Sequence, residues 1–266
     1  MDIRSLKLVC FSPTGTSRAV AQAVGRGIGH DGVEVVDITR PGGRTRRLET
    51  AADDLLLVAV PVHVGRVPEL VCRWLGTLKA DHTPAVCIVV YGNREFDDAL
   101  LELMDIIREC GGRPIAAAAF IGEHSFSSAD TPIAAARPDA ADLRRAERFG
   151  RAVGNKLRSV ASAEEALTVY VPGNHPYRER LPRPPGHFIA VGKACVQCGT
   201  CAEACPVGAI DVRASTAVEE DECIFCCACV KSCPEGARTM RASWLKDIAV
   251  RLSEDCRARK EPECFL

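Results

Sequence analysis

Several features that would place a chain in a particular class are missing from this sequence of 266 residues. Met1 leads through charged residues into a strand-like run, without the basic segment, apolar segment and small-residue cleavage site of a secretory signal. No apolar stretch reaches the length that a bilayer-spanning helix needs. The formal net charge of −1 gives no reason to expect nucleic-acid binding. We therefore expect a soluble, cytoplasmic protein without a membrane span.

Two nucleotide-binding motifs are missing as well. The sequence contains no G-K-[S/T] of a P-loop, so no lysine is placed to reach a terminal phosphate. It also contains no G-x-G-x-x-G dinucleotide fingerprint. Nucleoside triphosphates and direct oxidation of a pyridine nucleotide are therefore disfavoured.

Cysteine, by contrast, is abundant, with 15 residues. Eight of them follow a regular pattern near the C-terminus. The others, which include Cys10, Cys72, Cys87 and Cys110, lie inside apolar segments and share no common spacing. We interpret these as reduced, buried thiols and not as a disulfide framework, which fits a reducing cytosol.

The regular cysteines form two runs of the pattern C-x-x-C-x-x-C-x-x-x-C-P. The first run is Cys195, Cys198, Cys201, Cys205 and Pro206, and the second is Cys223, Cys226, Cys229, Cys233 and Pro234. The repeat continues beyond the cysteines, because Gly208-Ala209 and Gly236-Ala237 follow at the same offset. This predicts a duplicated half-domain with pseudo-two-fold symmetry. Cys227 departs from the symmetry, since it stands where the first run has Gly199. We interpret it as a small buried residue, and a spare or alternative ligand is the other interpretation.

The two runs resemble bacterial-type ferredoxins with two [4Fe–4S] clusters, in which the fourth cysteine of each run ligates the other run's cluster. The resemblance implies one cluster on Cys195, Cys198, Cys201 and Cys233, and a second on Cys223, Cys226, Cys229 and Cys205. Structural zinc is the alternative, because paired C-x-x-C units also bind zinc. A zinc site gains nothing from a third C-x-x-C step, so the spacing favours iron–sulfur clusters.

The N-terminal part begins with a strand, a loop and a helix. Leu6–Phe11 is a short apolar run typical of a buried parallel strand, and residues 18–28 carry small and apolar residues at helical spacing. The loop between them, Ser12-Pro13-Thr14-Gly15-Thr16-Ser17, is rich in hydroxyl groups. Its backbone N–H groups and the helix N-terminus would form an anion site, to which the hydroxyls could donate. The alternative is a simple N-capping turn.

The segments that follow predict a doubly wound α/β domain. Further strands are expected at Val33–Ile38, Leu55–Val60, Ala85–Tyr91 and Ile115–Ile121, with helices near 67–79, 96–111 and 139–159. Strands that alternate with helices indicate a parallel sheet. We therefore expect five parallel strands, with ligands bound beyond their carboxyl ends.

This domain resembles the flavodoxin family, whose first loop has the form (S/T)-x-T-G-x-(T/S) and holds the FMN phosphate. The resemblance implies the strand order 2-1-3-4-5, phosphate binding at the first loop and flavin binding at the loops after the third and fourth strands. The implied cofactor-binding residues are Ser12, Thr14, Gly15, Thr16, Ser17, Pro61, His63, Val64, Gly65, Tyr91, Gly92 and Asn93. Gly65 and Gly92 would let the backbone approach the flavin, and Tyr91 could lie against its face. The alternatives are an exposed loop histidine at His63 and a core tyrosine at Tyr91.

The remaining segments connect or follow the two domains. Gly122–Ser127 is a polar cluster at the end of the fifth strand, expected to approach the cofactor, to receive the C-terminal domain or to be solvated. We predict a flavodoxin-like domain at 1–160, a semi-rigid Pro/Arg-rich linker at 161–186 and a small α+β ferredoxin-like domain at 187–240. Residues 241–266 should form an amphipathic helix near 242–257, which could pack back on the first domain, and a frayed tail.

The full arrangement resembles the flavodoxin–ferredoxin fusions known as the EFR1 family. The resemblance implies an electron-transfer flavoprotein of anaerobic-type metabolism that holds FMN and two [4Fe–4S] clusters. Two functions follow as hypotheses: an electron relay that serves a redox partner protein, or an enzyme whose FMN reduces a small acceptor such as a quinone, free flavin or metal complex. A third hypothesis is a zinc-stabilised interaction module without redox chemistry.

Overall fold

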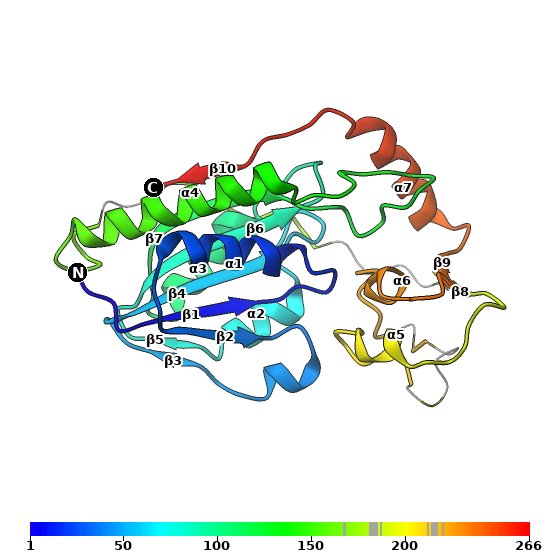
Figure 1. The fold of residues 1–266 in the computed structure, drawn as a ribbon, viewed down its shortest axis with the longest axis horizontal. Coiled ribbons are helices and arrows are strands. Elements are labelled where there is room, and N and C mark those ends of the chain that lie inside the picture. The colour runs from blue at the N-terminus through cyan, green and yellow to red at the C-terminus, as the bar shows by residue number, and fades with distance from the viewer. Residues whose placement is uncertain (167–168, 181–185, 187, 212, 214–217, 220) are drawn as a thin grey trace.

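The computed structural model describes residues 1–166, 169–180, 186, 188–211, 213, 218–219 and 221–266. Its main feature is a parallel sheet built on β1 (Ser5–Cys10), β2 (Val33–Asp37), β4 (Asp54–Pro61), β6 (Pro84–Tyr91) and β7 (Arg113–Ile121) (Figure 1). The residues of β4 and β6 are buried along almost their whole length. Strands covered on both faces read as continuous apolar runs, which is why the sequence predicts them within one or two residues.

The five parallel strands lie in the order β2-β1-β4-β6-β7. This is the expected flavodoxin-like order 2-1-3-4-5, and the prediction is confirmed. The sheet has a sixth strand, however, because β10 (Glu263–Phe265) pairs antiparallel with Ala117–Ala119 of β7. The expectation of a frayed C-terminal tail is therefore wrong. β7 would otherwise leave its backbone groups unpaired at the sheet edge, and the last residues of the chain satisfy three of its positions.

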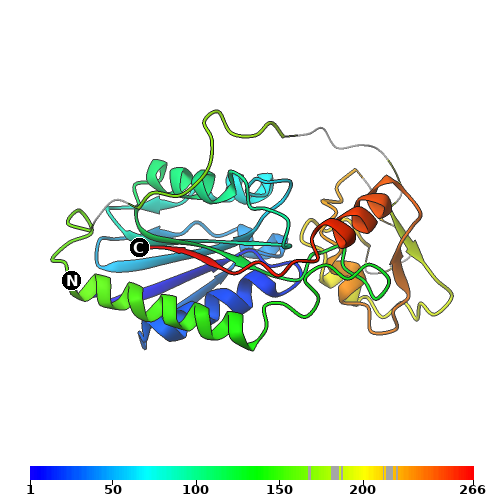
Figure 2. The ribbon, with the colours of Figure 1, turned by 90° about the horizontal axis from the view of Figure 1, so that it is seen from above.

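Helices cover both faces of the sheet, as Figure 2 shows. α1 (Thr16–Ile28) and α4 (Ala140–Arg158) share one apolar core with one face of the sheet. α2 (Glu69–Leu75) and α3 (Ala99–Glu109) share the other core. Short elements complete this part: η1 (Pro41–Arg44), β3 (Glu49–Thr50) and β5 (Lys79–Ala80). No helix in the described part of the chain is both long and apolar enough to cross a bilayer.

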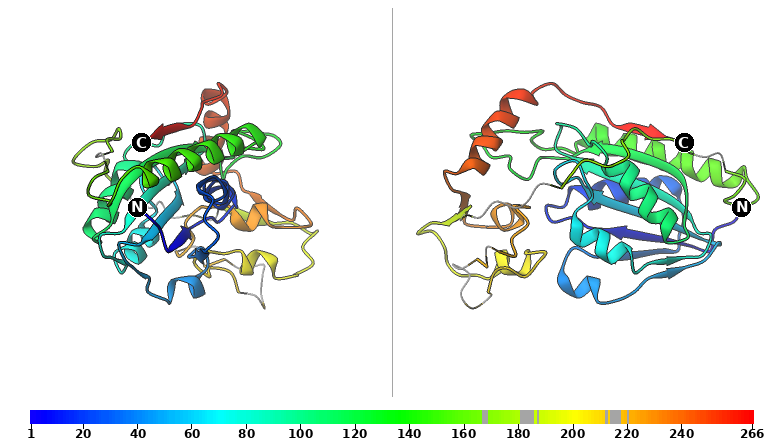
Figure 3. Two further views of the ribbon diagram at one scale, coloured as in Figure 1. Left: turned by 60° about the vertical axis from the view of Figure 1, so that its left-hand side comes forward. Right: turned by 180° about the vertical axis from the view of Figure 1, so that it is seen from behind.

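The cysteine-rich region lies beyond the carboxyl ends of the parallel strands (Figures 1 and 3). It contains β8 (Ile189–Val191), α5 (Thr200–Glu203), α6 (Ala228–Lys231) and β9 (Arg238–Met240), and β8 pairs antiparallel with β9. The two cysteine runs share their backbone conformation. Positive φ angles occur at Gln197 and Phe225, at Gly199 and Cys227, and at Gly208 and Gly236. The repeat in sequence is thus also a repeat in local structure.

α7 (Trp244–Asp255) connects the two parts of the molecule (Figure 3). At its start, the Trp244 ring makes edge contacts with Phe188 and Phe225 of the cysteine-rich region. Near its end, Ser253 Oγ donates to the carbonyl of Pro132 at 3.1 Å. The chain then returns along the parallel sheet to β10. The expected C-terminal helix therefore forms, and it bridges the two parts.

The linker is attached to the first domain through an acidic face of α3. Asp98 accepts from the backbone N–H groups of Asn174 and Arg178 at 2.9 and 2.6 Å. Tyr177 donates to Asp105, and Arg180 donates to Glu102. These three acids recur at helical spacing, so they lie on one face. The Pro/Arg-rich residues 181–185 of the expected linker lie outside the described residues.

Candidate functional site

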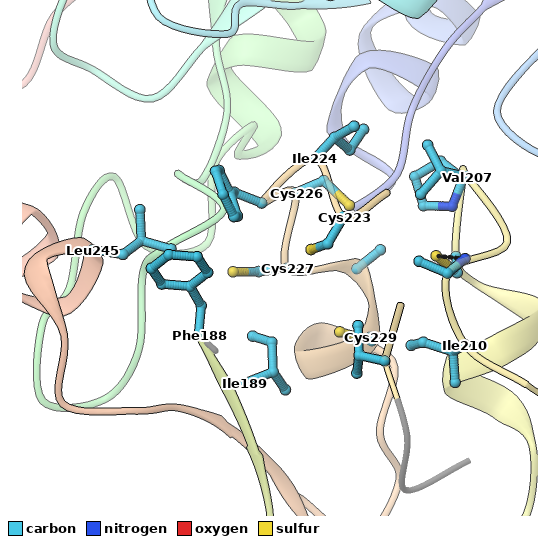
Figure 4. Close-up of a pocket in the computed structure, with 16 residues that line it drawn as sticks. Phe188, Ile189, Val207, Ile210, Cys223, Ile224, Cys226, Cys227, Cys229 and Leu245 are labelled. Carbon is cyan, nitrogen blue, oxygen red and sulfur yellow. Dashed lines mark hydrogen bonds between the residues drawn. The ribbon is translucent and has the colours of Figure 1, made fainter. Parts of the chain in front are cut away.

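Cysteines of both runs surround each of two hollows in the cysteine-rich region. Cys195, Cys198, Cys201 and Cys233 line the one farther from the parallel sheet, here named the distal hollow. Cys205, Cys223, Cys226 and Cys229 line the nearer one, the proximal hollow, which Figure 4 shows. These are the two crossed sets that the ferredoxin resemblance implies. Cys205 and Cys233 reach the hollow of the other run because each follows a short turn of helix at the end of its own run.

Backbone donors point at the crossing cysteines in both halves. Ala209 N–H donates to Cys205 Sγ at 3.3 Å, and Ala237 N–H donates to Cys233 Sγ at 3.2 Å. Hydrogen bonds of this kind stabilise negative charge on a cluster thiolate. The residues before these alanines, Gly208 and Gly236, both have positive φ angles. Glycine adopts this conformation without strain, which explains its presence at both positions of the repeat.

The bare thiols of the proximal hollow are poor acids. Burial raises the pKa of Cys226 to about 12 and that of Cys229 to about 11. Metal binding needs the thiolate, so iron has to displace these protons as a cluster assembles. Within the described parts of the chain, no three His, Cys, Asp or Glu side chains come close enough together to hold a single metal ion.

Cys227 also lines the proximal hollow, and it is buried. Its Sγ points toward Phe188, whereas the other labelled cysteines lie on the far side of its backbone (Figure 4). It occupies a left-handed position, with a φ of 52°, where the first run has glycine. The structure therefore favours the interpretation of Cys227 as a packing residue.

The first loop lies at the carboxyl end of β1, and α1 begins directly after it. Ser12 Oγ accepts from Arg18 N–H at 3.0 Å, which ties the loop to the first turn of α1. Ser17 Oγ is buried and has no hydrogen-bond partner among the residues that the structure describes. A buried hydroxyl without a partner is costly unless a ligand satisfies it. Together with the helix N-terminus, this orphaned hydroxyl fits an anion such as a phosphate.

The loops after β4 and β6 meet the first loop in a narrow cleft, here named the loop cleft. It is lined by residues of the three loops and of the segment after β7, including Thr14, Thr16, Pro61, His63, Tyr91, Gly92 and His124. A cavity of about 350 Å³, the edge cavity, continues from it past Val64 and Gly65. Eight of the twelve expected cofactor residues line one or both spaces, and Ser12, Gly15 and Ser17 lie in the first loop behind them.

Close packing also requires glycine at two positions of these loops. A Cβ on Gly65 would lie 2.4 Å from Asp97 Oδ2, and a Cβ on Gly92 would lie 2.2 Å from His124 Cδ2. Tyr91 is buried against Phe96, with ring centroids 5.6 Å apart, so it is a core residue at the end of its strand. Its edge still reaches the loop cleft.

Two histidines face these spaces in their neutral form. Burial lowers the pKa of His63 to about 4, and the charge of Arg180 acts in the same direction. Burial also lowers the pKa of His124 to about 4, with further contributions from His63, Arg94 and Lys231. His63 is half-buried and lines both spaces, so the structure does not favour the alternative of an exposed loop histidine. At neutral pH the site holds two uncharged imidazoles, which can exchange hydrogen bonds without adding a cation.

Asn93 is the one expected cofactor residue that the structure places elsewhere. Its Nδ2 donates to the carbonyls of Cys256 and Ala258 at 2.7 and 2.8 Å, and its Oδ1 accepts from Lys260 N–H. The side chain thus holds the returning C-terminal segment. The expectation for Asn93 is therefore corrected. The sequence could not show this role, because the partners of Asn93 lie more than 160 positions away.

Side chains from the second cysteine run and from α7 form one wall of the edge cavity. Ile224 and Phe225 from the second run, and Trp244, Leu245, Ile248 and Leu252 from α7, line it opposite the sheet loops. Cys226 of the proximal set lines the loop cleft together with Thr14, His63 and Gly92. We call the apolar side chains of the second cysteine run and α7 in this wall the roof of the edge cavity. The sequence predicts an amphipathic helix at α7, but this pattern does not identify the surface on which its apolar face packs.

Two basic side chains, Lys231 and Arg44, hold the parts together near the proximal hollow. Lys231 Nζ forms an ion pair with Glu123 and donates to the carbonyl of Ser127 at 2.8 Å. Burial pushes the pKa of Glu123 upward, but the hydrogen bond from Lys231 contributes to a net lowering. Arg44 of η1 donates to the carbonyl of Pro206 at 2.5 Å. The polar cluster after β7 therefore both lines the cavity and receives the cysteine-rich region.

Lys231→Glu should loosen this contact. The pair contributes about 0.5–1 kcal/mol, and the variant replaces it with repulsion from Glu123. We expect a larger maximum dimension in solution scattering, whereas Lys193→Glu, an exposed lysine of the same region, should leave the dimension unchanged. An unchanged profile for Lys231→Glu would mean that other contacts hold the two parts together.

The cysteine-rich region matches a known domain family. Residues 194–237 match the 4Fe-4S dicluster domain. The match spans both cysteine runs of this chain. No curated protein is similar enough in sequence to match the chain. The C-terminal region is therefore similar to ferredoxin-type domains, and we call it the ferredoxin-type domain below.

Solved structures are similar to the N-terminal part. A flavodoxin from the domain Archaea is 15% identical and has a TM-score of 0.38, covering 58% of this chain and 99% of that chain. The flavodoxin of Streptococcus pneumonia TIGR4 is 18% identical at a TM-score of 0.38, covering 56% and 97%. An NAD(P)H:quinone oxidoreductase from Methanothermobacter marburgensis is 14% identical at 0.35, covering 57% and 95%. At these scores the likeness carries no weight of its own, and the fold class stands on the strand order.

The chain thus combines a flavodoxin-like α/β domain with a small ferredoxin-type domain. The family match supports iron–sulfur clusters in the second domain. Together the two domains support a role in electron transfer.

Proposed function

We propose that the protein is an iron–sulfur flavoprotein that relays electrons within one chain, between two [4Fe–4S] clusters and FMN. When bound, the clusters would exchange single electrons and the flavin one or two. The distal cluster would be held by Cys195, Cys198, Cys201 and Cys233, and the proximal cluster by Cys205, Cys223, Cys226 and Cys229. The three loops of the flavodoxin-like domain would hold FMN.

One observation carries the proposal. Cys226 lines the proximal hollow and also the loop cleft, where it stands with Thr14, His63 and Gly92. The cysteine set of one cofactor and the loops expected for the other thus share a boundary. Electron transfer requires such proximity, and a chance fusion of two independent carriers does not.

The donor sets fit the groups they would bind. Eight thiols with two N–H···S hydrogen bonds suit two iron–sulfur clusters. The first loop offers a helix N-terminus and the orphaned hydroxyl of Ser17, which suit one phosphate and hence FMN. His63 and His124 are neutral, so they place no charge beside a flavin ring.

The roof of the edge cavity favours a relay over a reductase. A reductase acting on a quinone, free flavin or metal complex needs an open flavin edge. Phe225, Trp244 and Leu245 cover the cavity from the side opposite the loops. Access from solvent is instead greatest at the distal set, where Cys198 and Val196 are exposed. A redox partner protein or small electron carrier would exchange electrons there.

A dilution experiment tests the relay. Reduction of the clusters by dithionite is followed by stopped-flow absorbance of the flavin, over an about tenfold range of protein concentration. Transfer within one chain gives a rate independent of concentration, whereas collision between chains gives a proportional rate. We expect no dependence. A rate that falls in step with dilution would show two independent carriers on one polypeptide.

A further inference from the structure

The two halves of the ferredoxin-type domain differ between the first two cysteines of each run. The first run has Val196-Gln197 there, and the second has Ile224-Phe225. Gln197 and Phe225 share their backbone conformation, with φ angles of 54° and 58°. Val196-Gln197 is exposed, whereas Ile224-Phe225 is partly buried. The repeat thus keeps its backbone at this point and replaces a solvent-facing pair with an apolar pair.

The apolar pair of the second run faces the flavodoxin-like domain. Ile224 packs against the apolar core that α2 and α3 share with the parallel sheet. Phe225 lines the edge cavity and also the proximal hollow. The difference between the two halves therefore lies where the second run meets the edge cavity.

Three rings pack against one another in and behind the roof. The centroid of the Phe188 ring lies 4.7 Å from that of Phe225 and 5.3 Å from that of Trp244. Phe188 is buried, and it lines the proximal hollow behind the other two rings. Trp244 begins α7, where Ser243 Oγ accepts from Lys246 N–H at 3.4 Å. The two rings of the roof are therefore held in place by packing and by a helix cap.

The edge cavity has the size of a small-molecule site. Its volume is about 350 Å³, which lies within the roughly 300–1,000 Å³ of ligand pockets. The loop cleft is much smaller, at about 50 Å³. The phosphate of FMN is expected at the first loop, so the flavin ring fits the edge cavity and not the loop cleft.

The roof offers aromatic surface that the strand ends do not. Tyr91, at the end of β6, lines the cavity but is only 3% exposed, whereas Trp244 is 37% exposed. Phe126 also lines the cavity from the sheet side, where its ring stands edge-on to His124 with centroids 4.8 Å apart. A ring compound in the edge cavity would thus have Phe225 and Trp244 on the side opposite the sheet loops.

We propose that Phe225 and Trp244 form the outer face of the flavin site, so that the ferredoxin-type domain completes a site that the flavodoxin-like domain begins. This inference rests on the proposed function, because it takes FMN as the ligand of the sheet loops. Both side chains would be binding residues for the flavin ring and not cluster ligands. Their contact tightens flavin binding, because it removes apolar area from water and brings aromatic rings together.

Equilibrium binding of FMN tests the proposal. The protein is titrated with its clusters in place after dialysis has removed the flavin, and ultrafiltration separates free FMN. Trp244→Leu and Phe225→Leu should each weaken binding about tenfold. Trp244→Phe keeps an aromatic ring and should stay within about threefold of the native affinity. Val250→Ala changes an exposed position of α7 and should leave the affinity unchanged.

Two measurements on the same variants separate ring contact from a general loosening of the protein. Each variant should hold about eight irons, which shows that the ferredoxin-type domain is folded. Each should also keep the native maximum dimension in solution scattering. Weaker FMN binding together with a larger dimension would mean that the rings act by holding the domains together, and this would overturn the inference.

The inference and the proposed function fail in different ways. Unchanged FMN affinity in either leucine variant would overturn the inference alone. Native protein that binds no FMN would instead overturn the proposed function. Titration of the native protein therefore distinguishes the two failures before any variant is made.

Discussion

Cys205→Ala should remove the proximal cluster and leave the distal cluster in place. Cys205 is buried in the proximal hollow with Cys223, Cys226 and Cys229, although its own run otherwise surrounds the distal hollow. Iron content should fall from about eight to about four per chain, with acid-labile sulfide falling in parallel. Flavin reduction by the remaining cluster should become slow, because the lost cluster is the one whose cysteines border the loop cleft. Metal analysis and stopped-flow absorbance measure the two effects.

Cys227→Gly is the matched control. Cys227 is buried in the same hollow, but its sulfur points toward Phe188 (Figure 4). The substitution gives the second run the residue that the first run has at Gly199, and glycine accepts the positive φ there. We expect about eight irons and normal flavin reduction. A Cys205→Ala protein that keeps all its iron, or a Cys227→Gly protein that loses half, would mean that the ligand sets are assigned wrongly. Stoichiometric zinc without sulfide would replace the cluster proposal altogether.

Thr14→Glu should abolish retention of flavin. Thr14 lines the loop cleft in front of the first turn of α1, where the phosphate of FMN would lie. Two like charges about 4 Å apart near a protein surface repel by roughly 4 kcal/mol, and this corresponds to roughly a thousandfold loss of affinity. Flavin released from the native protein by heat should be FMN, since the chain offers one helix-terminal anion site at this loop. Flavin absorbance per chain, compared with iron per chain, measures the effect.

Two variants separate charge repulsion from a general effect of substitution. Thr14→Ser keeps the hydroxyl and should retain flavin. Thr45→Glu adds the same charge at an exposed position of the same domain and should retain it as well. Iron content should stay at the native value in all three variants, because the ferredoxin-type domain is untouched. Full flavin occupancy in Thr14→Glu would show that the phosphate lies elsewhere.

The parallel strands and the cysteine sets could be predicted from sequence because each has a local signature. A strand buried on both faces needs a continuous apolar run, and Leu55–Val60 is one. A four-iron cluster needs thiolates at fixed offsets, and both cysteine runs have the same offsets. The helix expected near 139–159 was also close, as α4 begins at the capping box of Asp139, whereas the helix expected near 67–79 ends at Leu75.

What could not be predicted depends on partners far along the chain. Glu263–Phe265 has no strand pattern, and it becomes β10 because β7 offers a free edge. Asn93 resembles a cofactor residue by its loop, but the segment 256–260 takes up its side chain. The roof of the edge cavity, which includes Phe225 and Trp244, forms only where the two domains meet. A single sequence does not show which surfaces of two domains are in contact. The acids on α3 were visible at helical spacing, but not the linker that they hold.

The return of the chain to β7 limits how the ferredoxin-type domain can move. The domain leaves the flavodoxin-like domain at one point, through the linker held at Asp98 and Glu102. It comes back at a second point, where Asn93 and β7 hold the segment after α7. A domain attached at one point can take up many orientations, whereas a second attachment restricts the orientations that it can reach. Any opening between the cysteine hollows and the sheet loops must therefore keep both attachments in place, or break the contacts of Asn93 and β10.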